Sequence, residues 1–420
     1  MAAIAVAGAG TPAPPPNTVV QVGAAQKVCQ LTGDLDHQFK PPRPTVSQTA
    51  TAWGLSGTDN GYSFLFGGKL WFLFGDSPPT PTFNGQPNTQ TDPPRTPIDN
   101  DAIASAAPQW SGDCPKLSFV PDSIGAYTSP VVTTAAGQAP VTLRTNEVPM
   151  AGVGVNGRMY LIFGTDNPAS NPPGGPSAPN GGPMRAVMTV LQDPAALQFT
   201  YLYDFSKPPN GKFIFVAIAP GPNGYLYFWG SEGGQTGYRH SPLYLARKQA
   251  ASIAKPGGMQ YFHGFDSHGR PVFGKTESAA VPLFSDDPQC VGEHSVQWNP
   301  YVARWVLLYN CADTTAANAR GIWMRLATHA WGPWTAPKTI FATSSGLCAF
   351  IHRKVTPSQP QCDSLSTPNR MNVQGGDYSP FIIPSFTTGG GRSSTFYYTL
   401  STWNPYQVVL MSTTIRSGSS

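Results

Sequence analysis

The sequence predicts an all-β protein, a five-bladed β-propeller built from four-stranded antiparallel blades. Among 420 residues, 44 are glycine and 45 are proline, a density that interrupts helices, while 40% hydrophobic residues are enough for a core. Apolar hairpins recur near residues 67, 156, 223, 300 and 390, as expected of a repeated structural unit. Further strand-like segments follow several of these hairpins, which gives four strands per repeat. A β-sandwich is the alternative, but it would show shorter and more evenly spaced strands.

The first hairpin covers residues 56 to 77, SGTDNGYSFLFGGKLWFLFGDS. Its Gly67-Gly68 pair can adopt the positive φ angles of a two-residue turn, and such a turn fixes which residues face each other. Counting outward from this turn places Asp59 opposite Asp76 at the open end of the hairpin.

The later hairpins extend the same pattern. The second turns at Asn156-Gly157, and the same count places Glu147 opposite Asp166. The fourth turns near residue 300 and carries Glu293 early in its first strand. The strands that follow hairpins are expected in the segments SPLYLARKQA (241–250), GIWMRLATHA (321–330) and YQVVLMSTTI (406–415), with an outer strand in QFTYLYDF.

We expect a single propeller domain over residues 18 to 415, because no segment between them reads as an interdomain linker. Residues 1 to 17 are expected to be either a flexible N-terminus or the remnant of a signal sequence, and 416 to 420 a flexible tail. The segment TVVQV at 18–22 is expected to add a strand to the last blade and close the ring.

Charge and cysteine content limit the possible partners and location. The net charge of +4 is spread without a basic cluster, so nucleic acid is not an expected partner, and no apolar run is long enough to span a membrane. Cys290 and Cys311 mirror each other about the turn near 300, within disulfide range. Cys348 and Cys362 close a short loop, which leaves Cys29 for Cys114. Six cysteines that pair this readily predict a secreted or cell-envelope protein.

Acidic residues are concentrated at the open ends of hairpins, although the chain has only 22 of them. Asp59 and Asp76 are the predicted catalytic pair, and Glu147, Asp166 and Glu293 are possible supporting carboxylates. Two carboxyl groups suffice to hydrolyse a glycosidic bond, one as acid and one as base or nucleophile. We expect Asp59 to be the base and Asp76 the acid. The alternative for each aspartate alone is a turn-forming residue that binds backbone amides.

Aromatic and polar side chains near the hairpin ends are candidate sugar-binding groups, because flat rings stack on carbohydrate faces. They are Trp53, Trp298 and Tyr378, together with Arg239 and His240 as partners for hydroxyl groups. Packing between blades is the alternative for the tryptophans, and a structural hydrogen bond is the alternative for His240. The chain lacks the sequence signatures of serine esterases, zinc proteases and nucleotide-binding enzymes. We expect no metal and no cofactor.

The motifs GTDNGYSFLFGGKLWFLFGDS, EVPMAGVGVNGRMYLIFG, YRHSPLYLAR, GEHSVQWNPYVARWVLLYN and WGPWT together resemble a bacterial family of five-bladed propellers. That family, formerly a domain of unknown function, includes endo-D-arabinanases, and the resemblance covers about residues 45 to 415. It implies a catalytic aspartate before the first strand of blade one and another at the end of the next strand, here Asp59 and Asp76. The sequence departs from the family pattern at YSPF (378–381) and in Pro-rich insertions at 77–98 and 167–183.

The resemblance implies a glycoside hydrolase that cleaves D-arabinofuranosyl linkages in mycobacterial-type arabinogalactan or lipoarabinomannan. Its partner would be that polysaccharide, and we expect the protein to be a monomer. The alternative is a propeller that binds cell-wall glycan without cleaving it.

Overall fold

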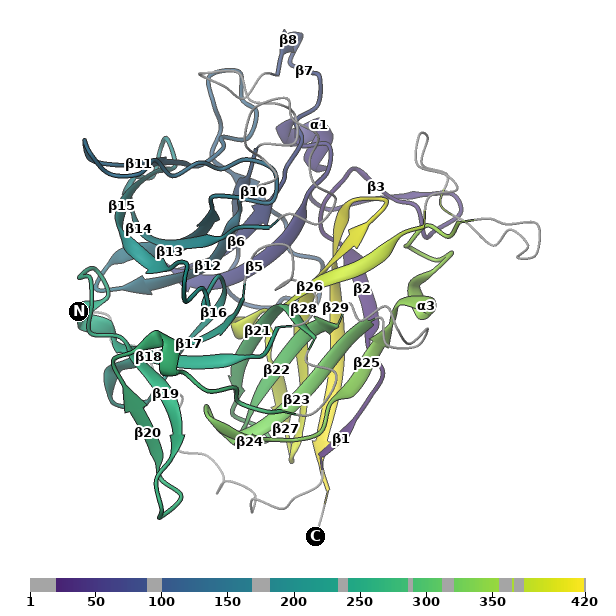
Figure 1. The fold of residues 1–420 in the computed structure, drawn as a ribbon. Coiled ribbons are helices and arrows are strands. Elements are labelled where there is room, and N and C mark those ends of the chain that lie inside the picture. The colour runs from purple at the N-terminus through teal and green to yellow at the C-terminus, as the bar shows by residue number, and fades with distance from the viewer. Residues whose placement is uncertain are drawn as a thin grey trace.

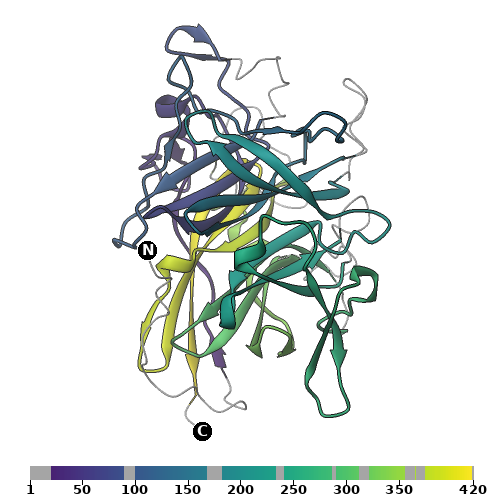
Figure 2. The same ribbon diagram turned by 90° about the vertical axis from the view of Figure 1, so that its left-hand side faces the viewer.

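Five sheets surround a common axis in the computed structural model, which confirms the predicted five-bladed β-propeller (Figure 1). Their strands pair antiparallel, except that β11 (Val131–Thr133) runs parallel to its neighbour at the edge of one sheet. The structure describes residues 20–88, 100–167, 182–232, 241–285, 290–311, 321–354, 365 and 374–418. The turned view shows the sheets arranged around the molecule as separate blades (Figure 2). No helix in these ranges is long and apolar enough to cross a membrane.

The blades are numbered along the chain, each from its innermost strand outward. Blade 1 contains β5 (Asp59–Phe66), β6 (Lys69–Gly75), β9 (Ala102–Ala106) and β10 (Ser118–Phe119). Blade 2 contains β12 (Pro149–Val155), β13 (Arg158–Thr165), β14 (Arg185–Asp193), β15 (Gln198–Ser206) and β11 (Val131–Thr133). Blade 3 contains β16 (Phe215–Pro220), β17 (Tyr225–Ser231), β18 (Tyr244–Gln249), β19 (Gln260–Phe265) and β20 (Pro271–Gly274).

The last two blades have more complex outer edges. Blade 4 contains β21 (Val291–Asn299), β22 (Arg304–Cys311) and β23 (Gly321–His329), and both β24 (Gly332–Trp334) and β25 (Lys338–Ala342) pair with β23. Blade 5 contains β26 (Gly376–Ile382), β28 (Ser393–Trp403) and β29 (Gln407–Ser417), with β27 (Thr388–Gly390) paired to β28. The two-stranded ribbons are β3 (Leu35–Asp36) with β4 (Arg43–Pro44) and β7 (Thr82–Phe83) with β8 (Gln86–Pro87); the α-helical turns are α1 (Thr49–Trp53) and α3 (Thr343–Gly346). Within the described ranges, 3-10 turns lie at Pro222–Gly224, Ala250–Ser252, Glu277–Ala279 and Pro384–Phe386.

The innermost strands form a closed ring in the order β5, β12, β16, β21, β26 and back to β5. Their side chains tie blades together across the centre. The buried Tyr62 of β5 donates its hydroxyl to the carbonyl of Ile218 in β16 at 3.0 Å, and Ser295 of β21 donates to the carbonyl of Pro380 in β26 at 2.7 Å. The innermost strands of a propeller run in the same direction, so the starting ends of these five strands lie at one face.

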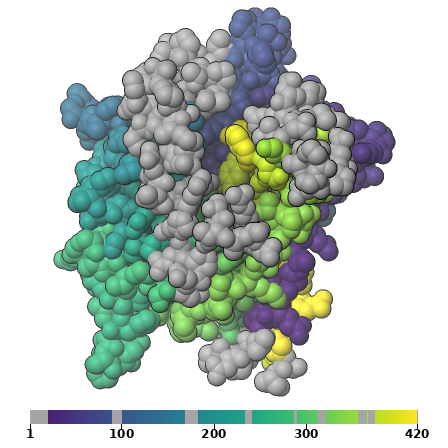
Figure 3. Space-filling model, turned by 45° about the vertical axis from the view of Figure 1, so that its right-hand side comes forward, coloured from purple at the N-terminus to yellow at the C-terminus, as the bar shows by residue number. Residues whose placement is uncertain are grey.

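The chain closes the ring with strands from its two ends. β1 (Val20–Val22) and β2 (Gln26–Gln30) both pair with β29, so the expected addition of an N-terminal strand to the last blade is confirmed. In the space-filling view the purple N-terminal segment lies beside yellow C-terminal residues near the bottom of the molecule (Figure 3). β29 continues to Ser417, which pairs with Val20, so ordered structure extends beyond the expected domain end at 415.

The predicted hairpin turns are confirmed, but the register changes before the open ends. Phe66 pairs with Lys69 across Gly67-Gly68, and Val155 pairs with Arg158 across the second turn. Toward the open end, the ladders of β5, β12, β21 and β26 each contain a register shift, whereas the ladder between β16 and β17 is regular. Irregularities of this kind are common next to active sites, because they re-aim side chains.

The cysteine pairing is confirmed where the structure describes both partners. Cys290 bonds to Cys311 with Cα atoms 5.0 Å apart, and Cys29 bonds to Cys114 with Cα atoms 6.0 Å apart. Cys348 is also disulfide-bonded, and its expected partner Cys362 lies outside the described residues. Two disulfide bridges are compatible with an extracellular protein.

Candidate functional site

Asp59 and Asp76 lie at the same end of blade 1, but they are not opposite each other. Asn60 and Gly61 have φ angles of 63° and 98°, and the ladder shifts here so that Asp59 pairs with Gly75. The expected facing of Asp59 and Asp76 is therefore wrong by one residue, because a count from the turn does not include the extra residue of a bulge. Asp76 directly follows the end of β6, where its φ of 37° turns the chain away from the strand.

Asp59 is the first residue of β5 and is only 8% exposed. Its Oδ2 accepts a hydrogen bond of 2.9 Å from the hydroxyl of Tyr378 in β26. Burial raises the pKa of Asp59 to about 6, and Tyr378, the facing Tyr406 hydroxyl and the Gly75 amide oppose part of this rise. Among the described residues, Oδ1 has no partner at ordinary hydrogen-bond geometry. Asp59 can therefore hold a proton close to neutral pH.

Asp76 is buried to a similar extent, and a backbone amide binds its carboxylate. Its two carboxylate oxygens accept the amide N–H of Asn146 at 2.9 and 3.1 Å. Its own amide donates to Oδ1 of Asp101 at 3.2 Å, and its carbonyl accepts the hydroxyl of Tyr406 at 2.9 Å. An amide donor stabilises the ionised form of a carboxyl group. The two neighbouring aspartates thus have different environments, one favouring the acid and the other the carboxylate, which is the arrangement that acid–base chemistry requires.

Tyr406 lies between the two aspartates, although it is not among the residues predicted from sequence. It is buried in the turn between β28 and β29, and burial together with the charges of Asp59, Asp76 and Asp101 raises its pKa well above the ordinary value. One signal could have found this turn. The sequence WNPY occurs twice, at 298–301 and at 403–406, and the second copy lies at the candidate site.

Trp403, which begins the second WNPY copy, is a large aromatic side chain at the margin of this site. Its ring is 50% exposed and stands edge-on to Tyr406, with centroids 5.8 Å apart and an interplanar angle of 84°. Trp298, which begins the first copy, is instead near the hairpin turn at the far end of β21 and packs on Trp305. The structure therefore does not bring Trp298 to Asp59, because inner strands present only their starting ends to this face.

Glu147 and Asp166 also fail to face each other, because the ladder of β12 shifts before its open end. Glu147 is 2% exposed, and its carboxylate accepts the backbone amides of Arg144 at 2.9 Å and Asn167 at 2.7 Å. Asp166 instead binds Arg185 on the outward neighbouring strand at 2.7 Å. The expected facing of Glu147 and Asp166 is therefore wrong, and a supporting role for either residue stays a prediction.

The remaining predicted residues fall into three groups. Glu293 is 9% exposed and lies near the start of β21, as Asp59 lies at the start of β5. A supporting role for Glu293 stays a prediction. Trp53 in α1 packs against Phe119 with ring centroids 5.6 Å apart, within a hydrophobic cluster, which fits the packing alternative. Arg239 and His240 lie outside the described residues. In the part of the chain that the structure describes, no cluster of three or more acidic, histidine or cysteine side chains could hold a metal ion.

A family model described as a domain of unknown function, DUF4185, matches residues 45–412. No curated protein sequence matches this chain. Solved structures with a similar fold include an exo-β-1,3-galactanase from Phanerochaete chrysosporium, with 10% identity over 92% of this chain and a TM-score of 0.43. This chain spans 64% of the length of that galactanase.

Two further solved structures cover most of both chains. A GH43_1 enzyme from Xanthomonas citri has 11% identity over 92% of this chain and 89% of its own, with a TM-score of 0.42. An N-acetylgalactosamine deacetylase from F. plautii has 9% identity over 94% and 95%, with a TM-score of 0.45. At these identities and TM-scores, the likeness says nothing about the reaction of this chain.

Proposed function

This chain belongs to the DUF4185 family, and from that premise we propose that it is a glycoside hydrolase that cleaves D-arabinofuranosyl linkages internally. The substrate would be arabinogalactan or lipoarabinomannan of the mycobacterial type, met outside the cell or in the cell envelope. One observation carries the proposal of hydrolysis. Two buried aspartates, Asp59 and Asp76, are neighbours at the face where the inner strands begin, and their environments favour opposite protonation states. The choice of D-arabinan is supported by the resemblance of the sequence motifs to the arabinanase-containing propellers.

The environments support a different division of roles from the one expected from sequence. Asp59, whose pKa burial raises to about 6, would protonate the leaving glycosidic oxygen. Asp76, whose carboxyl oxygens accept the Asn146 amide, would activate water or attack the anomeric carbon. We therefore propose Asp59 as the acid and Asp76 as the base or nucleophile, the reverse of the expected assignment.

The test is incubation of the purified protein with D-arabinan, followed by analysis of released oligosaccharides and of new reducing ends. The wild type should release oligosaccharides, whereas Asp59→Asn and Asp76→Asn should each lower turnover by several orders of magnitude and still bind the polymer. If the wild type binds arabinan and releases nothing, the protein is a glycan-binding propeller. If both variants keep more than about a tenth of the activity, the loss is below roughly 1.4 kcal/mol and the two aspartates are structural.

A further inference from the structure

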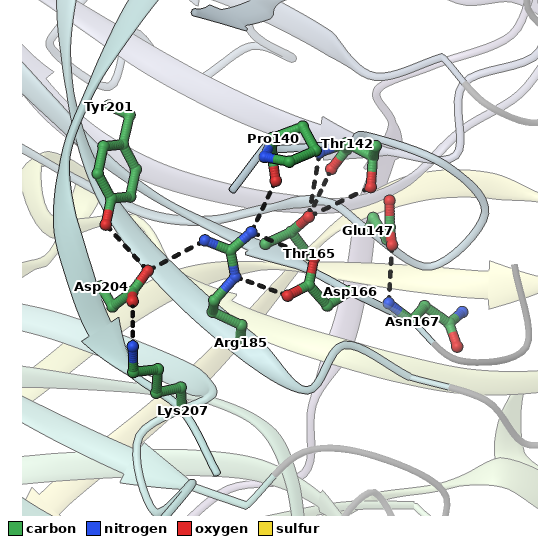
Figure 4. A network of polar contacts seen from close by, with 10 residues as sticks. All are labelled: Pro140, Thr142, Glu147, Thr165, Asp166, Asn167, Arg185, Tyr201, Asp204 and Lys207. Carbon is green, nitrogen blue, oxygen red and sulfur yellow. Dashed lines mark hydrogen bonds and ion pairs between the residues drawn. The ribbon is translucent and has the colours of Figure 1, made fainter. Parts of the chain in front are cut away.

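The segment from residue 140 to 147, here called the 140–147 loop, is fastened to the end of blade 2 at several points (Figure 4). The carbonyl of Pro140 accepts a hydrogen bond from Arg185 at 2.7 Å. The amide of Thr142 donates to the hydroxyl of Thr165 at 3.2 Å, and that hydroxyl donates back to the Thr142 carbonyl at 2.9 Å. Glu147 closes the loop through the amide of Asn167 at 2.7 Å.

Arg185 is the anchor of this arrangement. Its Nε binds Oδ2 of Asp166 at 2.7 Å, its Nη1 binds Oδ1 of Asp204 at 3.0 Å, and its Nη2 reaches the Pro140 carbonyl. The guanidinium is thus shared between two carboxylates and the loop backbone, and Arg185 is only 5% exposed. Lys207 and Tyr201 bind Asp204 on the outer side, and no dashed line in Figure 4 joins either residue to the loop. A planar guanidinium fixes all three partners in one geometry, which a lysine could not do.

The fastened loop directs one backbone group across to blade 1. Asn146 has a φ of 61°, and its amide N–H points to the two oxygens of Asp76 at 2.9 and 3.1 Å. The loop is therefore the structural link between the ion pair of blade 2 and the candidate base of blade 1.

We propose that Arg185 and Asp166 are positioning residues, which hold the 140–147 loop so that the Asn146 amide stays on the Asp76 carboxylate. This inference rests on the proposed function only for its consequence in catalysis. The titratable groups that face Asp76 from neighbouring elements are Asp59, Asp101 and Tyr406. The two aspartates among them can carry negative charge. If the amide moves away, repulsion from these acids is no longer balanced, and Asp76 should take up a proton at higher pH.

The first test compares Asp166→Asn with the wild type in arabinan hydrolysis. This variant keeps the size of the side chain and removes its charge, so kcat should fall about tenfold while KM stays within about twofold. The acidic limb of the kcat profile should move up by up to about one pH unit. Arg185→Lys, which keeps the positive charge but not the three-way geometry, should show the same direction of change. Lys207→Ala is the matched control from the same network and should leave kcat and its pH profile unchanged.

The second test does not depend on activity. In protein labelled with ¹⁵N at asparagine, the chemical shift of the Asn146 amide should change as Asp76 titrates. The Asn146 resonance is assigned as the signal that disappears in Asn146→Gly, a substitution that tolerates the positive φ at this position. The pH midpoint of this titration should rise in Asp166→Asn and stay unchanged in Lys207→Ala.

An unchanged midpoint in Asp166→Asn and Arg185→Lys would overturn the inference, whatever the activities. So would an equal loss of activity in Lys207→Ala, because the network would then act only through stability. If the wild type hydrolyses no arabinan but the midpoint shifts as expected, the proposed function fails and the positioning of Asp76 stands. Should Asp166→Asn not fold, the same comparison is made with Arg185→Lys.

Discussion

Replacing Asp59 with asparagine should make the protein more stable at alkaline pH while it removes activity. The carboxyl of Asp59 is 8% exposed, and burial raises its pKa from 3.8 to about 6. A rise of about two pH units corresponds to roughly 3 kcal/mol of unfolding free energy. Between pH 3.8 and about 6, the folded state binds more protons than the unfolded state. The stabilising contribution of protonated Asp59 is therefore fully present below pH 3.8 and is lost as pH rises through about 6.

The assay is thermal unfolding of wild type and Asp59→Asn across pH 4 to 8. Asparagine keeps an oxygen that can accept the Tyr378 hydroxyl and does not ionise, so the stability of the Asp59→Asn variant lacks this pH dependence. With roughly 2.1 cal/mol/K of unfolding entropy per residue and 420 residues, the stability difference corresponds to about 3 °C. The difference in melting temperature, variant minus wild type, should therefore increase by about 3 °C from pH 4 to pH 8.

A difference between the two proteins that stays constant from pH 4 to pH 8 would refute this reasoning. It would mean that Asp59 titrates in the folded state as it does in the unfolded chain, and that it could not serve as an acid at neutral pH. A wild-type basic limb of kcat/KM near pH 6 is the matching kinetic expectation, because activity should fall as the acid loses its proton.

Three further outcomes can be measured. Tyr378→Phe removes the hydroxyl that donates to Asp59, so the pKa of Asp59 should rise and the basic limb of the rate profile should move to higher pH. Cys290→Ser with Cys311→Ser should lower the unfolding free energy in denaturant titrations by roughly 2 to 4 kcal/mol, and a loss below about 0.5 kcal/mol would contradict it. Trp403→Ala should raise KM for long arabinan chains several-fold with little change in kcat, since an exposed ring offers a stacking face; an unchanged KM would exclude that role.

The propeller could be predicted from sequence because its signals are local. Pairs such as Gly67-Gly68 and Asn156-Gly157 specify tight turns, and the alternation of apolar residues around them specifies strands. The register at the open ends could not be predicted, because a bulge inserts a residue whose effect depends on contacts with another blade. Gly61 illustrates this: at its φ of 98°, an added Cβ would lie 3.1 Å from Thr399 in blade 5.

The site was predicted only in part, for the same reason. Asp59 and Asp76 can be identified from sequence because they lie at the ends of strands of one hairpin, which is a short-range property. Asn146 and Tyr406 reach them from blades 2 and 5, and no spacing in the sequence connects these positions. The Cys290–Cys311 bridge shows how errors can cancel. Asn299 pairs with Arg304, so the turn is longer than expected, but a later shift in β21 returns the two cysteines to bonding distance.

The pairing of β1 and β2 with β29 has a consequence for the timing of folding. Val20 pairs with Ser417, so a strand that precedes blade 1 in the sequence has its partner at the end of blade 5. Blades 1 to 4 are each built from continuous stretches of chain and can form as the polypeptide emerges. Blade 5 cannot be completed until β29 is available to pair with β1 and β2, and closing so large a loop is slow. A chain in which β29 has not yet been synthesised would therefore leave β1 and β2 unpaired, and unpaired strand edges are prone to aggregation.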